Sequence, residues 1–290
     1  MRGSPRSSPP RELRVRTRFA ALKSNLAYVV LGMGKSGTTA LYTAISREIE
    51  NAADHFFEVH DGAAIRRSDP ANALVAKLLL EKVRIGDVEW LHSTFDKRVF
   101  LVRDPRDLLV SRLLYKVRDM DLIFDETTFG TWLDALREKE RNPGSMSVVE
   151  LYELLESLSG EPSYHRVFGR VHRSALEKWE LLAHWYHLAR YEPFVDGETS
   201  ALSEYLEMPV SPDVEVDEKW RRVTRSKGYG DWKRWFLESD LRFVRSQAGD
   251  FFARFGYDED WDLDAEPVIE RETCSAYVER IVELRRSGRG

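Results

Sequence analysis

Leu26-Ala-Tyr-Val-Val-Leu-Gly32 is followed directly by Met33-Gly-Lys-Ser-Gly37 and then by Thr38-Thr-Ala-Leu-Tyr-Thr-Ala-Ile45. The first stretch is an unbroken apolar run rich in strand-forming residues, which is typical of a strand buried on both faces. The second is a glycine-rich loop, and the third has the spacing of an amphipathic helix. Strand, loop and helix in this order predict the first βα unit of an α/β protein.

The same order occurs a second time. Residues 98–103 have the composition of a short strand, Pro105 stands where a helix would begin, and residues 108–115 continue with helical spacing. The apolar segment 73–80 fits either a strand or a helix. Two βα units predict an α/β fold, with a central parallel sheet flanked by helices and ligands bound at the carboxyl ends of the strands.

The middle of the chain differs from this pattern. Residues 129–139, 148–158 and 174–190 have helical spacing, and we find no strand signal among them. They predict a helical insertion beside the sheet. Helices are also expected over residues 238–255 and 275–286.

We expect two regions of unequal size. Residues 1–22 are rich in arginine, proline and serine, which predicts a basic disordered tail. No later segment has the composition of a linker. We therefore expect residues 23–290 to form one domain.

Composition narrows the functional classes. Of the 290 residues, 42% are hydrophobic and 32% are charged, which is typical of a soluble globular protein. No apolar run approaches the ~18 residues of a membrane span, and no secretory signal is expected. The net charge of −5 argues against general nucleic-acid binding. Cys274 is the only cysteine, which fits a reducing compartment and predicts a cytoplasmic location. The oligomeric state stays open.

The first loop has the features of an anion site. Glycines let the backbone approach an anion closely, and the N–H groups at the start of a helix point toward it. Lys35 adds a positive charge, while Ser36, Thr38 and Thr39 add hydroxyl donors around Gly37. The loop is not a Walker A motif, because the leading glycine of that motif would fall at position 29, where this chain has valine.

The second loop offers a second anion site. Arg103 ends the strand at residues 98–103, where its guanidinium can bind a phosphate through two hydrogen bonds. Ser111 lies about two turns into the next helix and can direct a hydroxyl toward the same anion. The alternative is a surface salt-bridge cluster of residues 103–107.

Four segments in order resemble the donor-binding motifs of sulfotransferases that use 3′-phosphoadenosine 5′-phosphosulfate (PAPS). Lys35-Ser-Gly-Thr-Thr39 resembles their 5′-phosphosulfate loop, and the segment from Arg103 to Ser111 resembles their 3′-phosphate motif. Arg225-Ser-Lys-Gly-Tyr-Gly-Asp-Trp-Lys233 resembles their arginine-containing loop. Tyr191-Glu192 resembles the strand-end pair that lies against adenine in many members. Together the segments span residues 26 to 236.

The resemblance implies a P-loop-like sulfotransferase fold, PAPS as donor, adenosine 3′,5′-bisphosphate (PAP) as product, and no metal requirement. Lys35 would hold the sulfuryl group and stabilise the leaving phosphate. The cofactor-binding residues would be Lys35, Ser36, Gly37, Thr38, Thr39, Arg103, Ser111, Tyr191, Arg225, Lys227 and Gly228, although Lys227 and Gly228 stand in swapped order relative to the family.

The expected acceptor is a small molecule or a glycan that offers a hydroxyl or an amine. Cytosolic family members have a tryptophan after the two threonines, whereas this chain has Ala40. In this respect the chain is more similar to the carbohydrate-modifying members. Carbohydrate or lipid acceptors are therefore favoured.

The catalytic base is the least determined residue. Cytosolic members use a histidine two residues after a strand lysine, and Leu79 occupies that position here. Heparan-type members use a glutamate in the segment after the first helix, where this chain has Glu58. We expect Glu58 to be the base, with His60 and His92 as alternatives.

Two other functions stay open from the sequence. One is an ATP-dependent small-molecule kinase, which would also need a phosphate loop. The other is a nucleotide-binding protein of the same fold without turnover, which the missing histidine permits.

Overall fold

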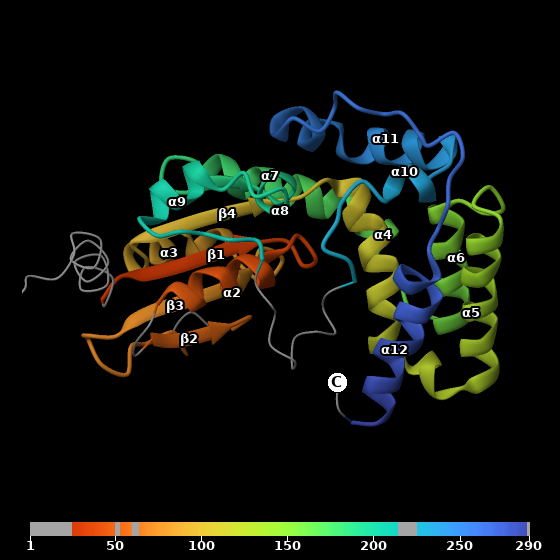
Figure 1. The fold of residues 1–290 in the computed structure, drawn as a ribbon, viewed down its shortest axis with the longest axis horizontal. Helices are drawn as coiled ribbons and strands as arrows, with labels where there is room; N and C mark the ends of the chain where they lie inside the picture. Colours follow the sequence, from red (N-terminus) through yellow and green to blue (C-terminus); the bar gives the residue numbers. More distant parts are fainter. Residues whose placement is uncertain (1–24, 50–52, 60–63, 214–224, 289–290) are drawn as a thin grey trace, which may run out of the picture.

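The computed structural model describes residues 25–49, 53–59, 64–213 and 225–288. In this part of the chain, five parallel strands form one sheet in the order β2-β3-β1-β4-β5 (Figure 1). The strands are β1 (Ala27–Gly32), β2 (Ala53–Phe57), β3 (Ala73–Leu79), β4 (Lys97–Val102) and β5 (His187–Arg190). The predicted α/β class, with a central parallel sheet flanked by helices, is confirmed.

Strand β1 is buried along its whole length, as its apolar sequence predicts. Because side chains alternate along a strand, Tyr28 and Val30 pack on one face of the sheet, and Val29 and Leu31 on the other. The sheet therefore has a hydrophobic core on each side.

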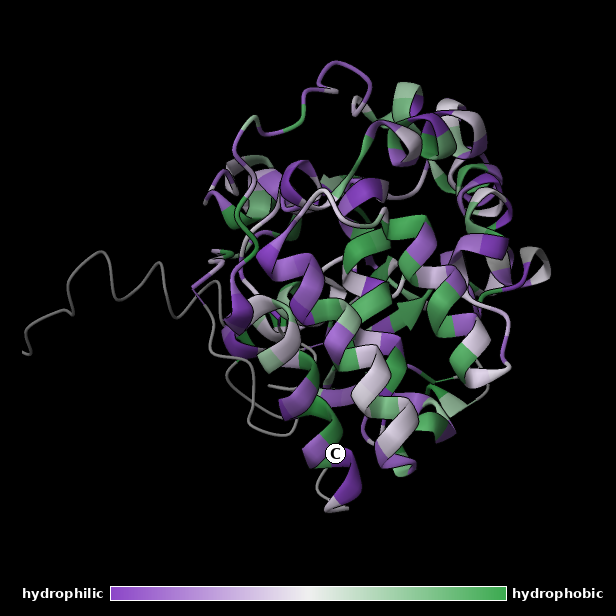
Figure 2. Ribbon diagram, turned by 90° about the vertical axis from the view of Figure 1, so that its right-hand side faces the viewer, coloured by the Kyte–Doolittle hydropathy of each residue, from purple (hydrophilic) through white to green (hydrophobic). Residues whose placement is uncertain are grey.

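Helices cover both of these faces. One core contains residues of α2 (Thr38–Glu48), α8 (Tyr191–Val195) and α9 (Ser200–Leu206). The larger core contains residues of α3 (Val88–Thr94), α4 (Pro105–Lys116), α5 (Glu126–Arg141), α6 (Val148–Ser159), α7 (Phe168–Leu182), α10 (Trp232–Trp235), α11 (Glu238–Phe255) and α12 (Ser275–Arg286). Figure 2 shows apolar and polar residues on the same helices, as expected for helices that bury one face. Short 3₁₀ segments lie at Ile85–Asp87, Val117–Asp119, Asp121–Phe124, Tyr164–Val167 and Arg271–Thr273.

Helix α4 begins where the sequence predicts it, and its start positions the second loop. Pro105 occupies the first turn, and the carboxylate of Asp104 accepts a hydrogen bond from the backbone N–H of Arg106. This cap fixes the direction in which the chain leaves β4. Ser111 is buried on this helix.

The structure corrects one part of the predicted middle region. The helix expected over residues 174–190 ends at Leu182, and residues 187–190 form strand β5. The expectation of no strand there was wrong. Strand β5 has four residues and, within the described part of the chain, pairs with β4 alone, so it is too short for a periodic pattern to show.

Two predictions fall outside the described residues, namely the tail over residues 1–22 and the alternative base His60. Within the described part, no helix is both long enough and apolar enough to cross a membrane.

Candidate active site

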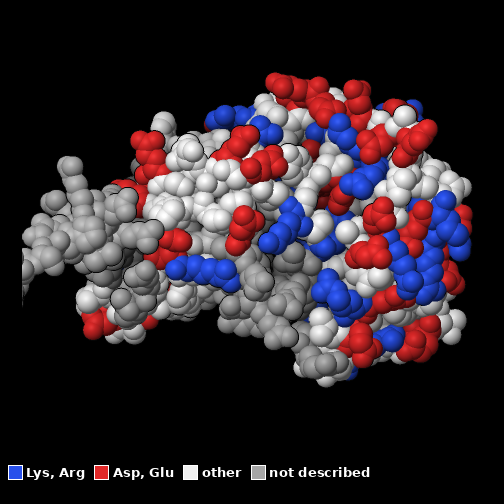
Figure 3. All heavy atoms as spheres, in the orientation of Figure 1, with Lys and Arg blue, Asp and Glu red and all other residues white. Residues whose placement is uncertain are grey.

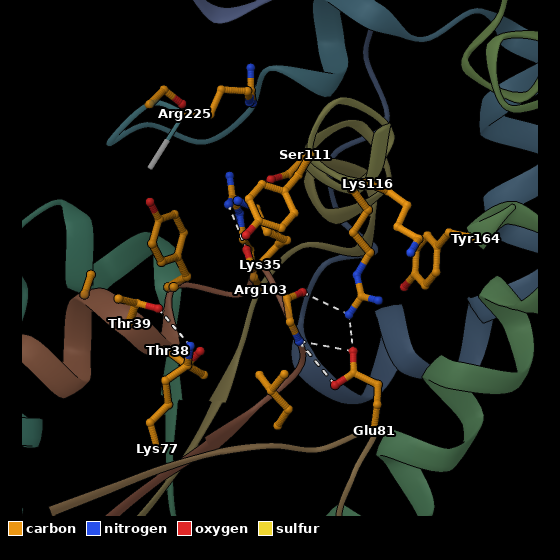
Figure 4. A pocket seen from close by; sticks show the side chains of 18 of the residues that line it. Lys35, Thr38, Thr39, Lys77, Glu81, Arg103, Ser111, Lys116, Tyr164 and Arg225 are labelled. Atoms are coloured by element: carbon orange, nitrogen blue, oxygen red, sulfur yellow. Dashed lines mark hydrogen bonds and ion pairs between the residues drawn. The ribbon is translucent and has the colours of Figure 1, made fainter. Parts of the chain in front are cut away.

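A cavity of about 760 Å³ lies at the carboxyl ends of β1, β3 and β4. It is also lined by helix α4 and by residues from segments 162–167, 191–195, 212–213 and 225–227. Of the residues singled out from the sequence, those that line it are Lys35, Gly37, Thr38, Thr39, Glu58, Arg103, Ser111, Tyr191, Arg225 and Lys227. Figure 4 shows many of these side chains converging from separate elements.

Three of the sequence-derived residues are placed differently. The hydroxyl of buried Ser36 donates to the carbonyl of Met33 at 2.7 Å, so it shapes the turn and does not line the cavity. Gly228 lies outside the lining, although its carbonyl accepts a hydrogen bond from Arg103 at 3.2 Å. His92 lies on α3 with its ring stacked on Trp185, and it does not line the cavity.

The first loop presents the start of helix α2 to the cavity. Gly37 is the N-cap residue, with φ of 91°, and Thr38 and Thr39 form the first turn. The first backbone N–H groups of a helix have no partner within that helix. The loop therefore directs N–H donors and the positive end of the helix dipole toward the cavity.

Both residues predicted to be catalytic have unusual backbone conformations. Among the described residues, only Lys35, Glu58 and Glu207 are non-glycine residues with positive φ, at 71°, 56° and 57°. A side chain in the left-handed region costs roughly 1–2 kcal/mol per residue. Such strain is concentrated at functional sites, where the surrounding structure fixes it.

Arg103 connects three loops of the site. Its guanidinium donates to the carbonyl of Lys35 at 3.2 Å and to that of Gly228 at 3.2 Å, and it stacks 4.4 Å from the ring centroid of Tyr191. Its Nε is buried and has no hydrogen-bond partner within the described residues. Arg103 thus holds the surrounding loops together through its two NH groups.

The segment that carries Arg225 and Lys227 is attached to helix α4 through Asp107. One carboxylate oxygen of Asp107 accepts a hydrogen bond from the N–H of Gly230 at 2.7 Å. Arg225 is ion-paired with Asp231 at 2.6 Å. Burial raises the pKa of the Asp107 carboxyl to about 6, although neighbouring Arg103 acts in the opposite direction.

Lys77 is a site residue that the sequence argument did not select. It is 2% exposed, and its ammonium donates to Thr39 Oγ1 at 2.8 Å and to the carboxylate of Glu58. Burial lowers the pKa of Lys77, against the opposing effect of Glu58. A single lysine inside the apolar segment 73–80 was the available signal, because a buried lysine needs a partner.

The cavity is strongly cationic. Burial, followed by the charges of Arg225, Arg103 and Lys77, holds the pKa of Lys35 well below its ordinary value. Seven cationic residues line the cavity, whereas only four of its lining residues are carboxylates. The cationic residues are Lys35, Lys77, Arg103, Arg112, Lys116, Arg225 and Lys227. The carboxylates are Glu58, Glu81, Asp119 and Asp213. Basic side chains also gather near the middle of the face shown in Figure 3. A bound anion would relieve this repulsion.

The arrangement supports group transfer from an anionic donor. The carbonyl of Lys35 accepts a hydrogen bond from Arg103, the ammonium of Lys35 lies over the ring of Tyr115, and the Lys77–Glu58 pair contacts Thr39 through Lys77. The site thus combines two groups of cationic and N–H-donating residues with a carboxylate, which are the groups that transfer from an anionic donor requires.

Comparison with known proteins adds a distant likeness. No family model matches the chain, and no curated protein matches it. Among solved structures, it is similar to mouse sulfotransferase SULT7A1 complexed with PAP, with 14% identity and a TM-score of 0.49 over 84% of this chain and 90% of that chain. A similarity this distant assigns no function to the chain. A function therefore has to be inferred from the residues of the cavity.

Proposed function

We propose that this protein transfers a sulfuryl group from PAPS to a hydroxyl or an amine of an acceptor. The observation that supports this most strongly is one cavity in which anion-binding residues from two separate βα loops meet beside a lysine–carboxylate pair. A nucleotide with a phosphate on each side of its ribose can satisfy both groups of residues at once. A nucleoside triphosphate carries its phosphates on one side only.

The first loop would bind the 5′-phosphosulfate. Lys35 has a lowered pKa because it is buried among other cations, so an anion at that position is electrostatically favoured. The N–H groups at the start of α2 and the hydroxyls of Thr38 and Thr39 would add hydrogen bonds.

The second group would bind the 3′-phosphate. Arg103 and Ser111 are both buried at the cavity wall, and Arg225 and Lys227 approach from the segment after α9. Tyr191 lines the same part of the cavity, and we assign its ring to the adenine contact.

The proposed reaction is a single in-line displacement. The acceptor oxygen or nitrogen forms a bond to sulfur while the bond from sulfur to the 5′-phosphate oxygen breaks, and PAP leaves. Glu58 accepts the acceptor's proton, and Lys35 and Lys77 stabilise the charge that develops on the transferring group and the leaving oxygen. Because these lysines supply the positive charge, we expect no metal requirement.

The acceptor would be a small molecule or a glycan, bound at the end of the cavity lined by Tyr115, Ser163 and Tyr164. The last two residues belong to the segment between α6 and α7, which gives the helical insertion a role in acceptor binding. We also propose that residues 23–290 act as one domain. With buried Cys274 as its only cysteine, the protein fits the cytoplasm.

Thermal shift with nucleotides tests this proposal. PAP should raise the melting temperature by mass action without magnesium, and should do so more than ADP or ATP at equal concentration. Stabilisation by magnesium-ATP but not by PAP would refute the proposal and favour a kinase.

A further inference from the structure

The ion pair between Glu81 and Arg112 contacts both the backbone N–H and the backbone carbonyl of Gly34 in the first loop. The N–H of Gly34 donates to the carboxylate of Glu81, with N···O distances of 3.1 and 3.2 Å. The carbonyl of Gly34 accepts a hydrogen bond from the guanidinium of Arg112 at 2.9 Å. Glu81 and Arg112 are also ion-paired with each other, so the three groups form a closed ring of contacts (Figure 4).

The two partners come from different elements and are held there independently. Glu81 lies just after strand β3, and Arg112 lies on α4, where it stacks 4.3 Å from the ring centroid of Tyr164. The pair therefore fixes the loop relative to both the sheet and helix α4.

Lys35, the residue after Gly34, has a backbone conformation that depends on contacts of this kind. Lys35 has a φ of 71°, a conformation that side chains disfavour and that persists only where surrounding contacts hold it. Its own carbonyl accepts from Arg103, while the preceding carbonyl accepts from Arg112. Two arginines thus fix two successive carbonyls, and between them they set where the Lys35 side chain points.

The charges argue against a direct role for this pair in binding an anion. Arg112 lines the cavity, but its guanidinium is already matched by the carboxylate of Glu81. The N–H of Gly34 is occupied by the same carboxylate, so it is not available to a phosphate. The pair lies at the wall of the cavity and acts on the loop that faces the ligand.

We infer that Glu81 and Arg112 are positioning residues that hold the peptide of Gly34, so that Lys35 and the N–H groups after it face the 5′ group of the nucleotide. This inference rests on the proposed function. It also has a specific consequence, because loss of the pair should weaken recognition of the 5′-phosphate and leave recognition of the 3′-phosphate intact.

Dissociation constants for PAP, adenosine 3′-phosphate and adenosine 5′-phosphate separate these two effects. The affinity ratio of PAP to adenosine 3′-phosphate measures what the 5′-phosphate contributes. The ratio of PAP to adenosine 5′-phosphate measures what the 3′-phosphate contributes. We expect Arg112→Gln and Glu81→Gln each to lower the first ratio about tenfold and to change the second less than about twofold. Arg112→Lys should restore part of the first ratio.

The direction in which Glu81→Gln changes the first affinity ratio distinguishes a positioning role of Arg112 from direct phosphate binding by Arg112. If Arg112 were itself a phosphate ligand, Glu81→Gln would free its charge and raise the first ratio, which would overturn the inference. Equal losses in both ratios, or no loss in either, would also overturn it. If Arg112→Gln does not fold, the nearly isosteric Glu81→Gln still decides the question.

A matched control is available on the surface. Arg254 pairs with Glu180 at 2.8 Å and lies against Trp179, and neither Arg254 nor Glu180 lines the cavity. Arg254→Gln and Glu180→Gln should leave both ratios at their wild-type values. Failure of the wild-type protein to bind PAP would instead refute the proposed function, which keeps the two failures distinct.

Discussion

Replacing Gly37 with alanine tests how the first loop is packed against the nucleotide site. Gly37 has a φ of 91°, and an added Cβ would lie 2.2 Å from Cδ2 and 2.5 Å from Cε2 of Tyr191. Atoms cannot approach this closely, so the ring has to move. Tyr191 is 6% exposed and stacks on Arg103, which means that its displacement disturbs the proposed 3′-phosphate site as well.

The expected cost has two parts. Alanine in the left-handed region costs roughly 1–2 kcal/mol. Forcing an extra methyl group into a packed site typically costs another ~1–3 kcal/mol. Gly37→Ala should therefore lower the free energy of unfolding by about 2–5 kcal/mol, measured by urea denaturation, and should weaken PAP binding about tenfold in calorimetry.

Gly160 provides the matched control. It has a φ of 71°, and an added Cβ would meet no neighbouring group within 4 Å. Gly160→Ala should therefore lower the free energy of unfolding only by the cost of the left-handed backbone conformation. PAP binding should be unchanged. In a Tyr191→Leu background, the cost of Gly37→Ala should fall toward that of Gly160→Ala. Equal costs for Gly37→Ala and Gly160→Ala in the wild-type background would refute the packing argument.

Three further predictions concern separate parts of the site. Arg103→Ala should weaken PAP by about 1.5–3 kcal/mol more than it weakens adenosine 5′-phosphate, and an equal loss for both ligands would reject the 3′-phosphate assignment. Glu58→Gln should lower turnover by ~10²–10⁴-fold with PAP affinity nearly unchanged, whereas Lys35→Ala should lower both turnover and affinity. Near-normal turnover in Glu58→Gln, with loss in His92→Ala, would restore a histidine base. For Asp107, the folded pKa of about 6 exceeds the ordinary 3.8, so its contribution to the free energy of unfolding should fall by about 2 kcal/mol as pH rises from about 4 to 7. Asp107→Asn should remove this slope in urea denaturation across that range.

The sequence predicted the parts of the fold that have a long periodic signal. Helices expected over residues 238–255 and 275–286 have those limits in the structure, because their apolar residues recur on one face over several turns. Strand β5 was missed because four residues provide no such period, and because the preceding helical pattern extends toward it.

The residues of the site also separate into those that a local motif identifies and those that only the tertiary structure brings together. Residues in local motifs, such as Lys35 and Arg103, were found because parallel strands bring their carboxyl ends to one edge of the sheet. Lys77 was missed because its contact with Thr39 depends on the register that places it opposite Val30 in β1. Nothing local in the sequence specifies that register.

The contacts of Glu81 and Arg112 depend on tertiary structure to an even greater degree. These residues are 31 positions apart and meet only because β3 and α4 end on the same side of the first loop. Ser36 illustrates the opposite error, since a hydroxyl in a phosphate loop suggests a ligand contact, yet the turn itself uses that hydroxyl.

A crystal structure with PAP bound is the most direct test of the proposed donor site. The 5′-phosphate is expected within hydrogen-bonding distance of the Lys35 ammonium and of the N–H groups at the start of α2, and the 3′-phosphate is expected to contact Arg103 and Ser111. PAP bound outside this cavity, or bound in it with its two phosphates exchanged between these groups, would contradict the account.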